Sequence, residues 1–229
     1  IASAWFMLFA FIAVCVLFKV SHWTIHHAHK WVSNSAASTA HKLHGKTLLR
    51  ALIVMSLLIL AKFTYIASLS NYYTFYLIEK FHVPLQHAQL YLFAFLAAVA
   101  VGTFAGGPIG DRIGRKAVIW ISFIGMVPFA LMMPYANLLW TVIFTMLAGM
   151  ILSSAFAAMV VYAQEAVPGR VGMVAGMMFG LMFGISGIAA AALGVLADTH
   201  GLEWVFKLCS FIPLLGLLTA FLPKTNGKA

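Results

Sequence analysis

The sequence predicts an all-α integral membrane protein, on three observations. Hydrophobic residues make up 63% of the 229 residues and charged residues only 8%, whereas a soluble domain carries about 25% charged residues. The apolar residues form runs long enough for a helix to cross about 30 Å of hydrocarbon at about 1.5 Å per residue. These runs lack the apolar–polar alternation of a transmembrane strand. Mean hydropathy is +1.00, which agrees with burial in lipid.

Seven membrane-spanning helices are predicted, over about 1–20, 50–79, 85–106, 117–134, 138–163, 171–197 and 203–222. Their orientation follows from the bases, because Lys and Arg collect in cytoplasmic loops. If the first span ends inside, eleven of the 14 Lys and Arg residues lie on the cytoplasmic side, and only Lys80 and Lys207 lie outside. Because these bases lie in loops beside apolar spans, the net charge of +9 is explained by orientation in the membrane and not by nucleic-acid binding. We expect a multi-pass protein of the inner membrane whose tail at 224–229 is cytoplasmic.

The segment 21–49 is predicted to be a basic, His-rich cytoplasmic linker. Two of its histidines, His22 and His26, have the spacing that places side chains on one helix face, as in some metal sites. No acid or Cys accompanies them, so we interpret the segment as a solvated loop near lipid headgroups and expect no metal. The chain begins at Ile1, without a Met and already within a span, which we interpret as a fragment whose first part is absent.

One charged, glycine-rich stretch separates two long apolar runs: Gly107-Pro108-Ile109-Gly110-Asp111-Arg112-Ile113-Gly114-Arg115-Lys116. We expect a tight cytoplasmic loop here, since glycines allow sharp turns and the bases mark the inner side. Asp111 is expected just before the next helix, where a carboxylate can accept hydrogen bonds from exposed backbone N–H groups. The pattern resembles the signature loop of the major facilitator superfamily of secondary transporters.

That resemblance implies twelve spans in two six-helix halves, with the loop between the second and third span of a half. Further stretches, Lys62–Tyr65, Tyr72–Tyr76 and Tyr162–Glu165, make residues 50–223 similar to the C-terminal half of fosmidomycin-resistance efflux transporters. By this resemblance 1–20 is the last helix of the N-terminal half and 21–49 the linker. The chain's partner is then the missing N-terminal six-helix half of the same protein.

The resemblance also implies a cytoplasmic gate in which an acid pairs with the signature loop. We expect Glu165 to meet Arg115 or Arg112, and Asp111 to face a helix N-terminus of the other half. Such contacts would hold the outward-facing state and release on inward opening. An ordinary interfacial salt bridge, worth about 0–1 kcal/mol, is the alternative. The predicted gate comprises Gly107, Gly110, Asp111, Arg112, Gly114, Arg115, Lys116, Glu165 and Arg170.

Two patterns recur from residue 76 onward at offsets of 84 to 87 residues. Tyr76-x-x-Glu79 before Pro84 recurs as Tyr162-x-x-Glu165 before Pro168, and Gly107-x-x-x-Asp111-x-x-Gly114 recurs as Gly194-x-x-x-Asp198-x-x-Gly201. The offset corresponds to three spans, so the copies face opposite sides of the membrane. This predicts an inverted 3+3 repeat.

Lys62 is predicted to lie deep in the membrane, twelve residues beyond Arg50, or about 18 Å along a helix. A cation there costs about 3 kcal/mol, so it should face a polar cavity or a partner. The predicted substrate cavity contains Lys62, Tyr65, Ser68, Asn71 and Tyr72. We expect Lys62 to bind an anionic group such as a phosphonate or carboxylate. The alternative is a structural ion pair with an acid of the absent half.

Glycines recur along the span 171–197, at Gly172, Gly176, Gly180, Gly184 and Gly187. Small residues at this spacing allow helices to approach closely, so we expect a helix-packing face. Sliding or bending of this helix during transport is the alternative.

No Walker loop, nucleophile elbow, zinc signature or dinucleotide fingerprint is present, so neither an enzyme nor a cofactor is predicted. The leading hypothesis is a proton-coupled efflux antiporter, driven by the proton gradient, whose partners are membrane lipid and a small-molecule substrate. An uptake carrier for an endogenous organic anion on the same fold is an alternative. A seven-span receptor is a further alternative from a different class.

Overall fold

The computed structural model describes residues 11, 14–20, 22, 45–167 and 171–221. The chain divides into two units, 1–40 and 41–229, which are treated separately. In the first unit the described residues are helical and their side chains are exposed. Only the second part of the predicted first span is therefore described, and most of the predicted linker 21–49 lies outside the described residues.

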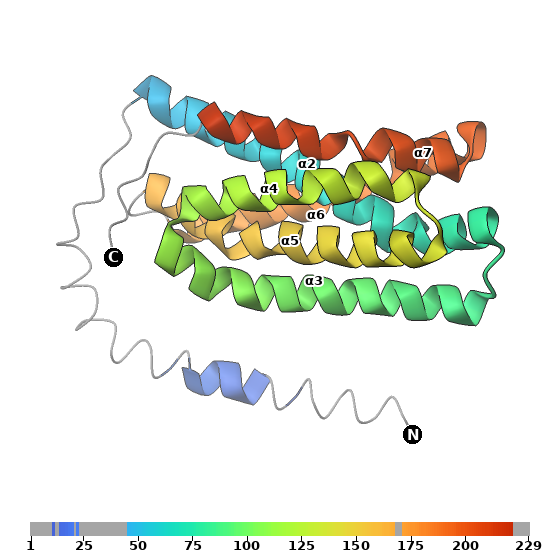
Figure 1. Ribbon diagram of the computed structural model, residues 1–229. Coiled ribbons are helices and arrows are strands. Elements are labelled where there is room, and N and C mark those ends of the chain that lie inside the picture. Colours follow the sequence, from blue (N-terminus) through green and yellow to red (C-terminus); the bar gives the residue numbers. More distant parts are fainter. Residues whose placement is uncertain (1–10, 12–13, 21, 23–44, 168–170, 222–229) are drawn as a thin grey trace. The chain divides into compact units, whose positions relative to one another are not determined.

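The second unit is a helix bundle in which consecutive membrane-length segments run in opposite directions (Figure 1). Its elements are α2 (Gly45–Phe81), α3 (Leu85–Ile113), α4 (Arg115–Met132), η1 (Met133–Tyr135), α5 (Leu138–Ala166), α6 (Val171–His200), α7 (Leu202–Cys209) and η2 (Ile212–Phe221). Within the described residues, six stretches are long and apolar enough to cross a membrane, with α7 and η2 together forming the sixth. They correspond to the last six predicted spans.

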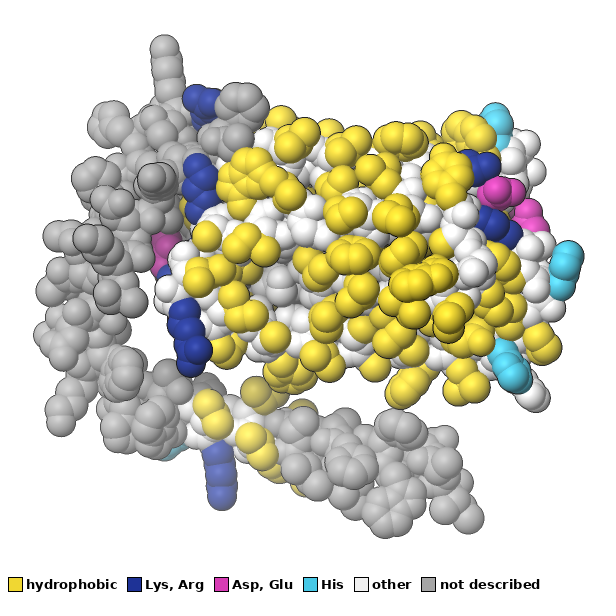
Figure 2. All heavy atoms as spheres, viewed as in Figure 1, with side chains coloured by type: hydrophobic (Ala, Val, Ile, Leu, Met, Phe, Trp, Pro, Cys, Tyr) yellow, Lys and Arg dark blue, Asp and Glu magenta, His cyan; other side chains and the backbone are white. Residues whose placement is uncertain are grey.

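The bundle surface has the polarity of a membrane protein. On the face that Figure 2 shows, apolar side chains cover the middle of the bundle, while charged side chains and histidines gather at its two ends. Large apolar residues such as Phe93, Phe104 and Ile188 are at least 70% exposed in this chain. Because such exposure in water would be unfavourable, these faces fit contact with lipid or with further apolar helices.

The predicted loop at 107–116 was wrong in its extent. Helix α3 continues through Pro108 to Ile113, and only Gly114 separates it from α4. Asp111 therefore lies in the last turn of α3 and not just before α4. A helix that extends beyond hydrocarbon keeps satisfying its own backbone groups, which outweighs the weak helix propensity of the glycines. Gly114 is required at the break itself, because its φ of 89° would strain any other residue.

The same backbone break occurs at Gly201, between α6 and α7. Its φ is 82°, and its N–H donates to the carbonyl of Ala197, as the N–H of Gly114 donates to that of Gly110. Three membrane crossings separate the two glycines, so they lie at opposite ends of the bundle (Figure 1).

If the bundle is divided into the two triplets of the predicted repeat, α2 to α4 and α5 to η2, the most extensive helix contacts lie between the triplets. Helix α3 packs along α5, and α2 packs along α6, while α4 and α2 both pack against η2. The core lies around α2, whose Leu58, Ile59, Tyr73 and Tyr76 are fully buried. Helix α2 thus positions both the buried Lys62 and the residues at one end of the bundle.

Candidate functional site

At the end of the bundle predicted to be cytoplasmic, Arg115 joins three helices. Its Nε lies 3.0 Å from Glu165 Oε1 at the end of α5, and one of its terminal nitrogens lies 3.8 Å from Asp111 Oδ1 in the last turn of α3. The side chains of Arg115 and Glu165 are 24% and 34% exposed, and that of Asp111 is 75% exposed. The expected ion pair between Glu165 and a signature-loop base is confirmed, on Arg115.

The other residues of the predicted gate differ in burial. Arg112 is exposed, and a Cβ added at Gly107 would meet nothing within 4 Å. Gly110 is buried, where a Cβ would make ordinary contacts with Ala158 and Val118. Lys116 is half-buried, and Arg170 lies outside the described residues. The gating role of this set stays a prediction.

Lys62 lies in the middle of α2 and is only 2% exposed. Its Nζ has no hydrogen-bond partner among the described residues. Two aromatic rings lie near the amine instead: the ring centroid of Phe63 is 5.9 Å from Nζ, and that of Phe156 on α5 is 5.5 Å away. Sequence reasoning had expected a polar cavity or a charged partner, and it did not foresee the two rings.

None of the other four residues of the predicted substrate cavity forms a hydrogen bond with the Lys62 amine in the described structure. Ser68 donates to the carbonyl of Tyr65 at 2.7 Å, and Asn71 donates to that of Ala67 at 2.8 Å, so both bond to their own helix. Tyr72 donates across to the carbonyl of Ala190 on α6 at 2.7 Å. Tyr65 is buried, and its hydroxyl has no hydrogen-bond partner in the described structure.

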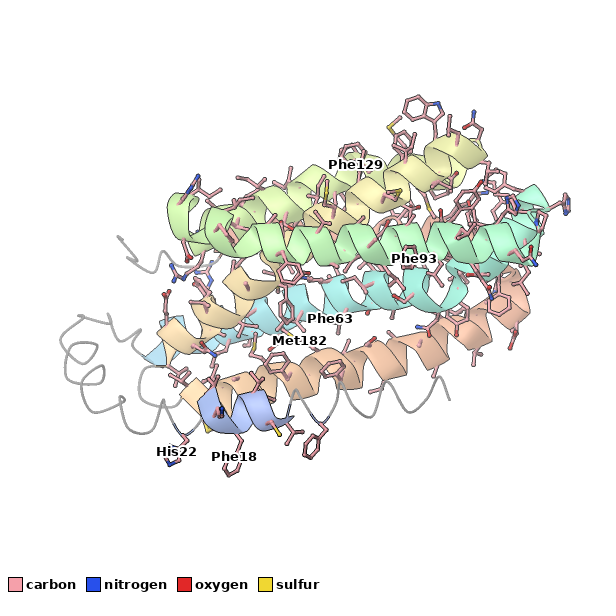
Figure 3. The ribbon with its side chains drawn as sticks, turned by 90° about the horizontal axis from the view of Figure 1, so that it is seen from below. Phe18, His22, Phe63, Phe93, Phe129 and Met182 are labelled. Carbon is pink, nitrogen blue, oxygen red and sulfur yellow. The ribbon has the colours of Figure 1, made fainter. Side chains whose placement is uncertain are left out.

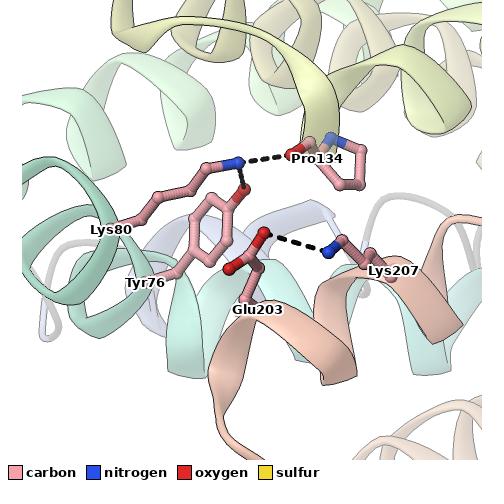
Figure 4. Close-up of polar contacts among 5 residues, drawn as sticks. All are labelled: Tyr76, Lys80, Pro134, Glu203 and Lys207. Carbon is pink, nitrogen blue, oxygen red and sulfur yellow. Dashed lines mark hydrogen bonds and ion pairs between the residues drawn. The ribbon is translucent and has the colours of Figure 1, made fainter.

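A polar cluster that sequence reasoning missed lies at the opposite end of the bundle (Figure 4). Lys80 donates to the hydroxyl of Tyr76 at 3.0 Å and to the carbonyl of Pro134 in η1. Close by, Lys207 pairs with Glu203 at 3.0 Å within α7. Lys80 and Lys207 had served only as markers of orientation. The four-residue spacings Tyr76–Lys80 and Glu203–Lys207 were the available signal.

A cavity of about 480 Å³ between α2 and α6 brings the repeated patterns together. Its lining includes Glu79 from the first pattern and Gly194 and Asp198 from the second, with Tyr72 and Leu202. At the other end, Glu165 and Asp111 are the corresponding acids, and Arg115 lies between them. In the predicted repeat, Leu202 holds the position that Arg115 holds at the other end, so this one position carries a charge at only one of the two ends.

The glycines predicted for helix packing are not packed inside this unit. A Cβ added at any of Gly172, Gly176, Gly180, Gly184 and Gly187 would meet nothing within 4 Å in the described structure. By contrast, Gly102 and Gly106 on α3 lie directly against the backbone of α5, where an added Cβ would overlap Met150 and Ser154. These two were missed, although Gly102, Gly106 and Gly110 have the same four-residue spacing.

Comparison with known proteins identifies the family. The family model of the Major Facilitator Superfamily matches residues 52–229. The chain belongs to the major facilitator superfamily. This match confirms the predicted family resemblance. Members of the superfamily are multi-pass membrane transporters and not enzymes.

Two relatives within the superfamily are similar along nearly the whole chain. The fosmidomycin resistance protein of Escherichia coli (strain K12) is 49% identical over 225 residues, which is 98% of this chain and 55% of that protein. The uncharacterized MFS-type transporter YfnC of Bacillus subtilis (strain 168) is 38% identical over 227 residues, or 96% of this chain and 55% of that protein. The chain thus spans about half the length of the curated relatives it matches.

Proposed function

We propose that this chain works as the C-terminal half of a proton-coupled efflux transporter for fosmidomycin-like or other small anionic drugs. The observation that carries the proposal is the 49% identity to a fosmidomycin resistance protein over 98% of the chain. On this proposal the proton gradient drives export.

The proposed architecture is a six-helix half with an inverted 3+3 repeat. It is supported by the matching breaks at Gly114 and Gly201, which lie three crossings apart at opposite ends of the bundle. A first six-helix half would precede it, with residues 1–20 as its last helix and 21–49 as the linker. Coverage of 55% of each relative agrees with this division.

In the proposed mechanism the substrate binds near the membrane midplane between the halves, and the halves rock to expose it to each side in turn. Lys62 contributes the positive charge that attracts an anion. A buried cation without a partner is costly, and an anionic substrate would offset that cost. The contacts of Arg115 with Glu165 and Asp111 would hold the cytoplasmic side closed and separate on inward opening.

Uptake of an endogenous organic anion remains a second candidate, because a buried Lys62 amine would serve either direction of transport. Membership of the transporter superfamily weighs against the receptor hypothesis.

Drug susceptibility distinguishes export from uptake. Cells that lack the full-length gene are compared with cells that carry it, and with cells that carry Lys62→Gln, during exposure to fosmidomycin and to an uncharged antibiotic. Export predicts that deletion lowers the inhibitory concentration of fosmidomycin several-fold and leaves that of the uncharged compound unchanged, with Lys62→Gln resembling the deletion. A rise in the inhibitory concentration on deletion would instead support uptake of fosmidomycin, and no change would contradict fosmidomycin as a substrate in either direction.

A further inference from the structure

We propose that Phe63 and Phe156 form an aromatic cover over Lys62, and that Phe156 must move aside before an anion can reach the amine. This inference rests on the proposed function, in which Lys62 binds the anionic group of the substrate. Binding of an anion by Lys62 does not by itself require any residue to move, whereas the aromatic cover makes movement of Phe156 a condition for binding.

The first observation is the environment of the amine. An ammonium group has three N–H donors, and none of them has a hydrogen-bond partner in the described part of the chain. A cation–π contact contributes about 0.5–2 kcal/mol but leaves N–H donors without acceptor oxygens. The rings therefore only partly compensate the buried amine, whereas a phosphonate or carboxylate would supply the missing acceptors.

The second observation is the gradient of exposure outward from Lys62. The amine belongs to a side chain that is 2% exposed, Phe63 and Phe156 are half-buried, and Phe179 on α6 is 39% exposed. The rings of Phe156 and Phe179 are in contact, with centroids 6.2 Å apart. The three rings come from α2, α5 and α6, and the most exposed of them, Phe179, contacts Phe156, which lies beside the amine. Figure 3 shows Phe63 with Met182 in the region between α2 and α6.

The positions of the two rings limit the directions from which an anion can approach the amine. A charge-assisted hydrogen bond needs an oxygen about 2.8 Å from Nζ. The ring of Phe156, centred 5.5 Å away, occupies one approach, and that of Phe63, centred 5.9 Å away, occupies another. Phe63 shares α2 with Lys62, so it stays with the amine when α2 moves. Phe156 is on α5, so a shift of α5 against α2, or a rotation of the Phe156 side chain, uncovers the amine.

The test measures the accessibility of Lys62 directly. The full-length carrier in membranes is treated briefly with a water-soluble amine-acylating reagent, and acylation of individual lysines is quantified by mass spectrometry. Lys19, which is exposed, serves as the internal reference for the reagent. Phe156→Ala is compared with Phe144→Ala, a matched control on the same helix whose ring contacts Phe129 and Trp140.

We expect Lys62 to be acylated at least tenfold more slowly than Lys19 in the unchanged protein. Phe156→Ala should raise the Lys62 rate about tenfold, and fosmidomycin should reduce it again, while Phe144→Ala should have no effect. Phe156→Leu, which keeps apolar bulk but removes the ring, should raise the rate to an intermediate degree and serves if the alanine variant does not accumulate.

If Lys62 is acylated at the same rate with and without the Phe156 ring, the proposed aromatic cover is wrong. Such a result would leave the proposed transport function intact, because susceptibility of the Lys62→Gln strain is measured separately. Conversely, full drug export by Lys62→Gln would refute the anion-binding role of Lys62, even if the Phe156 substitutions change its accessibility.

Discussion

Arg115 Nε lies 3.0 Å from Glu165 Oε1, which joins the start of α4 to the end of α5. Both side chains are partly exposed, so the pair contributes about 0–1 kcal/mol to the free energy of unfolding. A contact that is weak in stability yet spans two helices can break and reform at low cost. The proposed latch therefore has to be distinguished from an ordinary surface ion pair by its effect on transport and not by its effect on stability.

Reversing the charge of this pair tests the latch. We expect Arg115→Glu to lower transport at least tenfold, because the introduced carboxylate would repel both Glu165 and Asp111. The double variant Arg115→Glu/Glu165→Arg should recover a substantial part of the activity. Substrate flux in vesicles and thermal unfolding of the purified carrier are measured together. A double variant as inactive as the single one would argue against pairwise contact as the reason for the loss.

Asp111 is the acid of the signature stretch, and Asp198 holds the corresponding position in the second copy of the pattern, so it can serve as a control. Asp111→Asn should reduce transport while leaving abundance unchanged, because its side chain is 75% exposed and contributes little to folding. Asp198→Asn, the corresponding exposed acid at the other end, has no arginine at the equivalent of position 115 and should have a smaller effect. Flux is normalised to the amount of carrier on an immunoblot. Equal losses in the two variants would contradict a special role for Asp111.

Hydrophobic runs predicted the six described spans well, since length and polarity alone decide whether a helix crosses a membrane. The pairing of Glu165 with Arg115 was also foreseen. The environment of Lys62 was not, because one of the two rings beside its amine, that of Phe156, comes from α5, and one sequence does not show which faces of distant helices meet. For the same reason, the sequence predicts a packing face at the glycines of α6, which have open space around them in the described bundle, and misses Gly102 and Gly106, which pack against α5.

These two sets of glycines should differ in stability. At Gly106 an added Cβ would overlap the backbone of Ser154, so Gly106→Ala should lower the free energy of unfolding by about 1–3 kcal/mol. At Gly184 the space is open within the described bundle, so Gly184→Ala should leave that bundle's stability unchanged or slightly raised, since Ala favours helix over Gly. Thermal unfolding in detergent measures both. If Gly106→Ala is as stable as the unchanged carrier, the close approach of α3 and α5 is incorrect.

The orientation of the bundle can be tested at the two matching breaks. Single cysteines replace Ile113 and Thr199, which are both exposed and lie one residue before Gly114 and two before Gly201. The carrier used is the full-length protein with Cys15, Cys209 and any cysteine outside this chain changed to Ala. The bases around Gly114 predict the cytoplasmic side, and three crossings place Gly201 opposite. In right-side-out vesicles a membrane-impermeant maleimide should therefore label position 199 at once and position 113 only after permeabilisation. Labelling of both before permeabilisation would contradict the inverted relationship of the two triplets, and labelling of 113 alone would reverse the predicted orientation and remove the cytoplasmic gate.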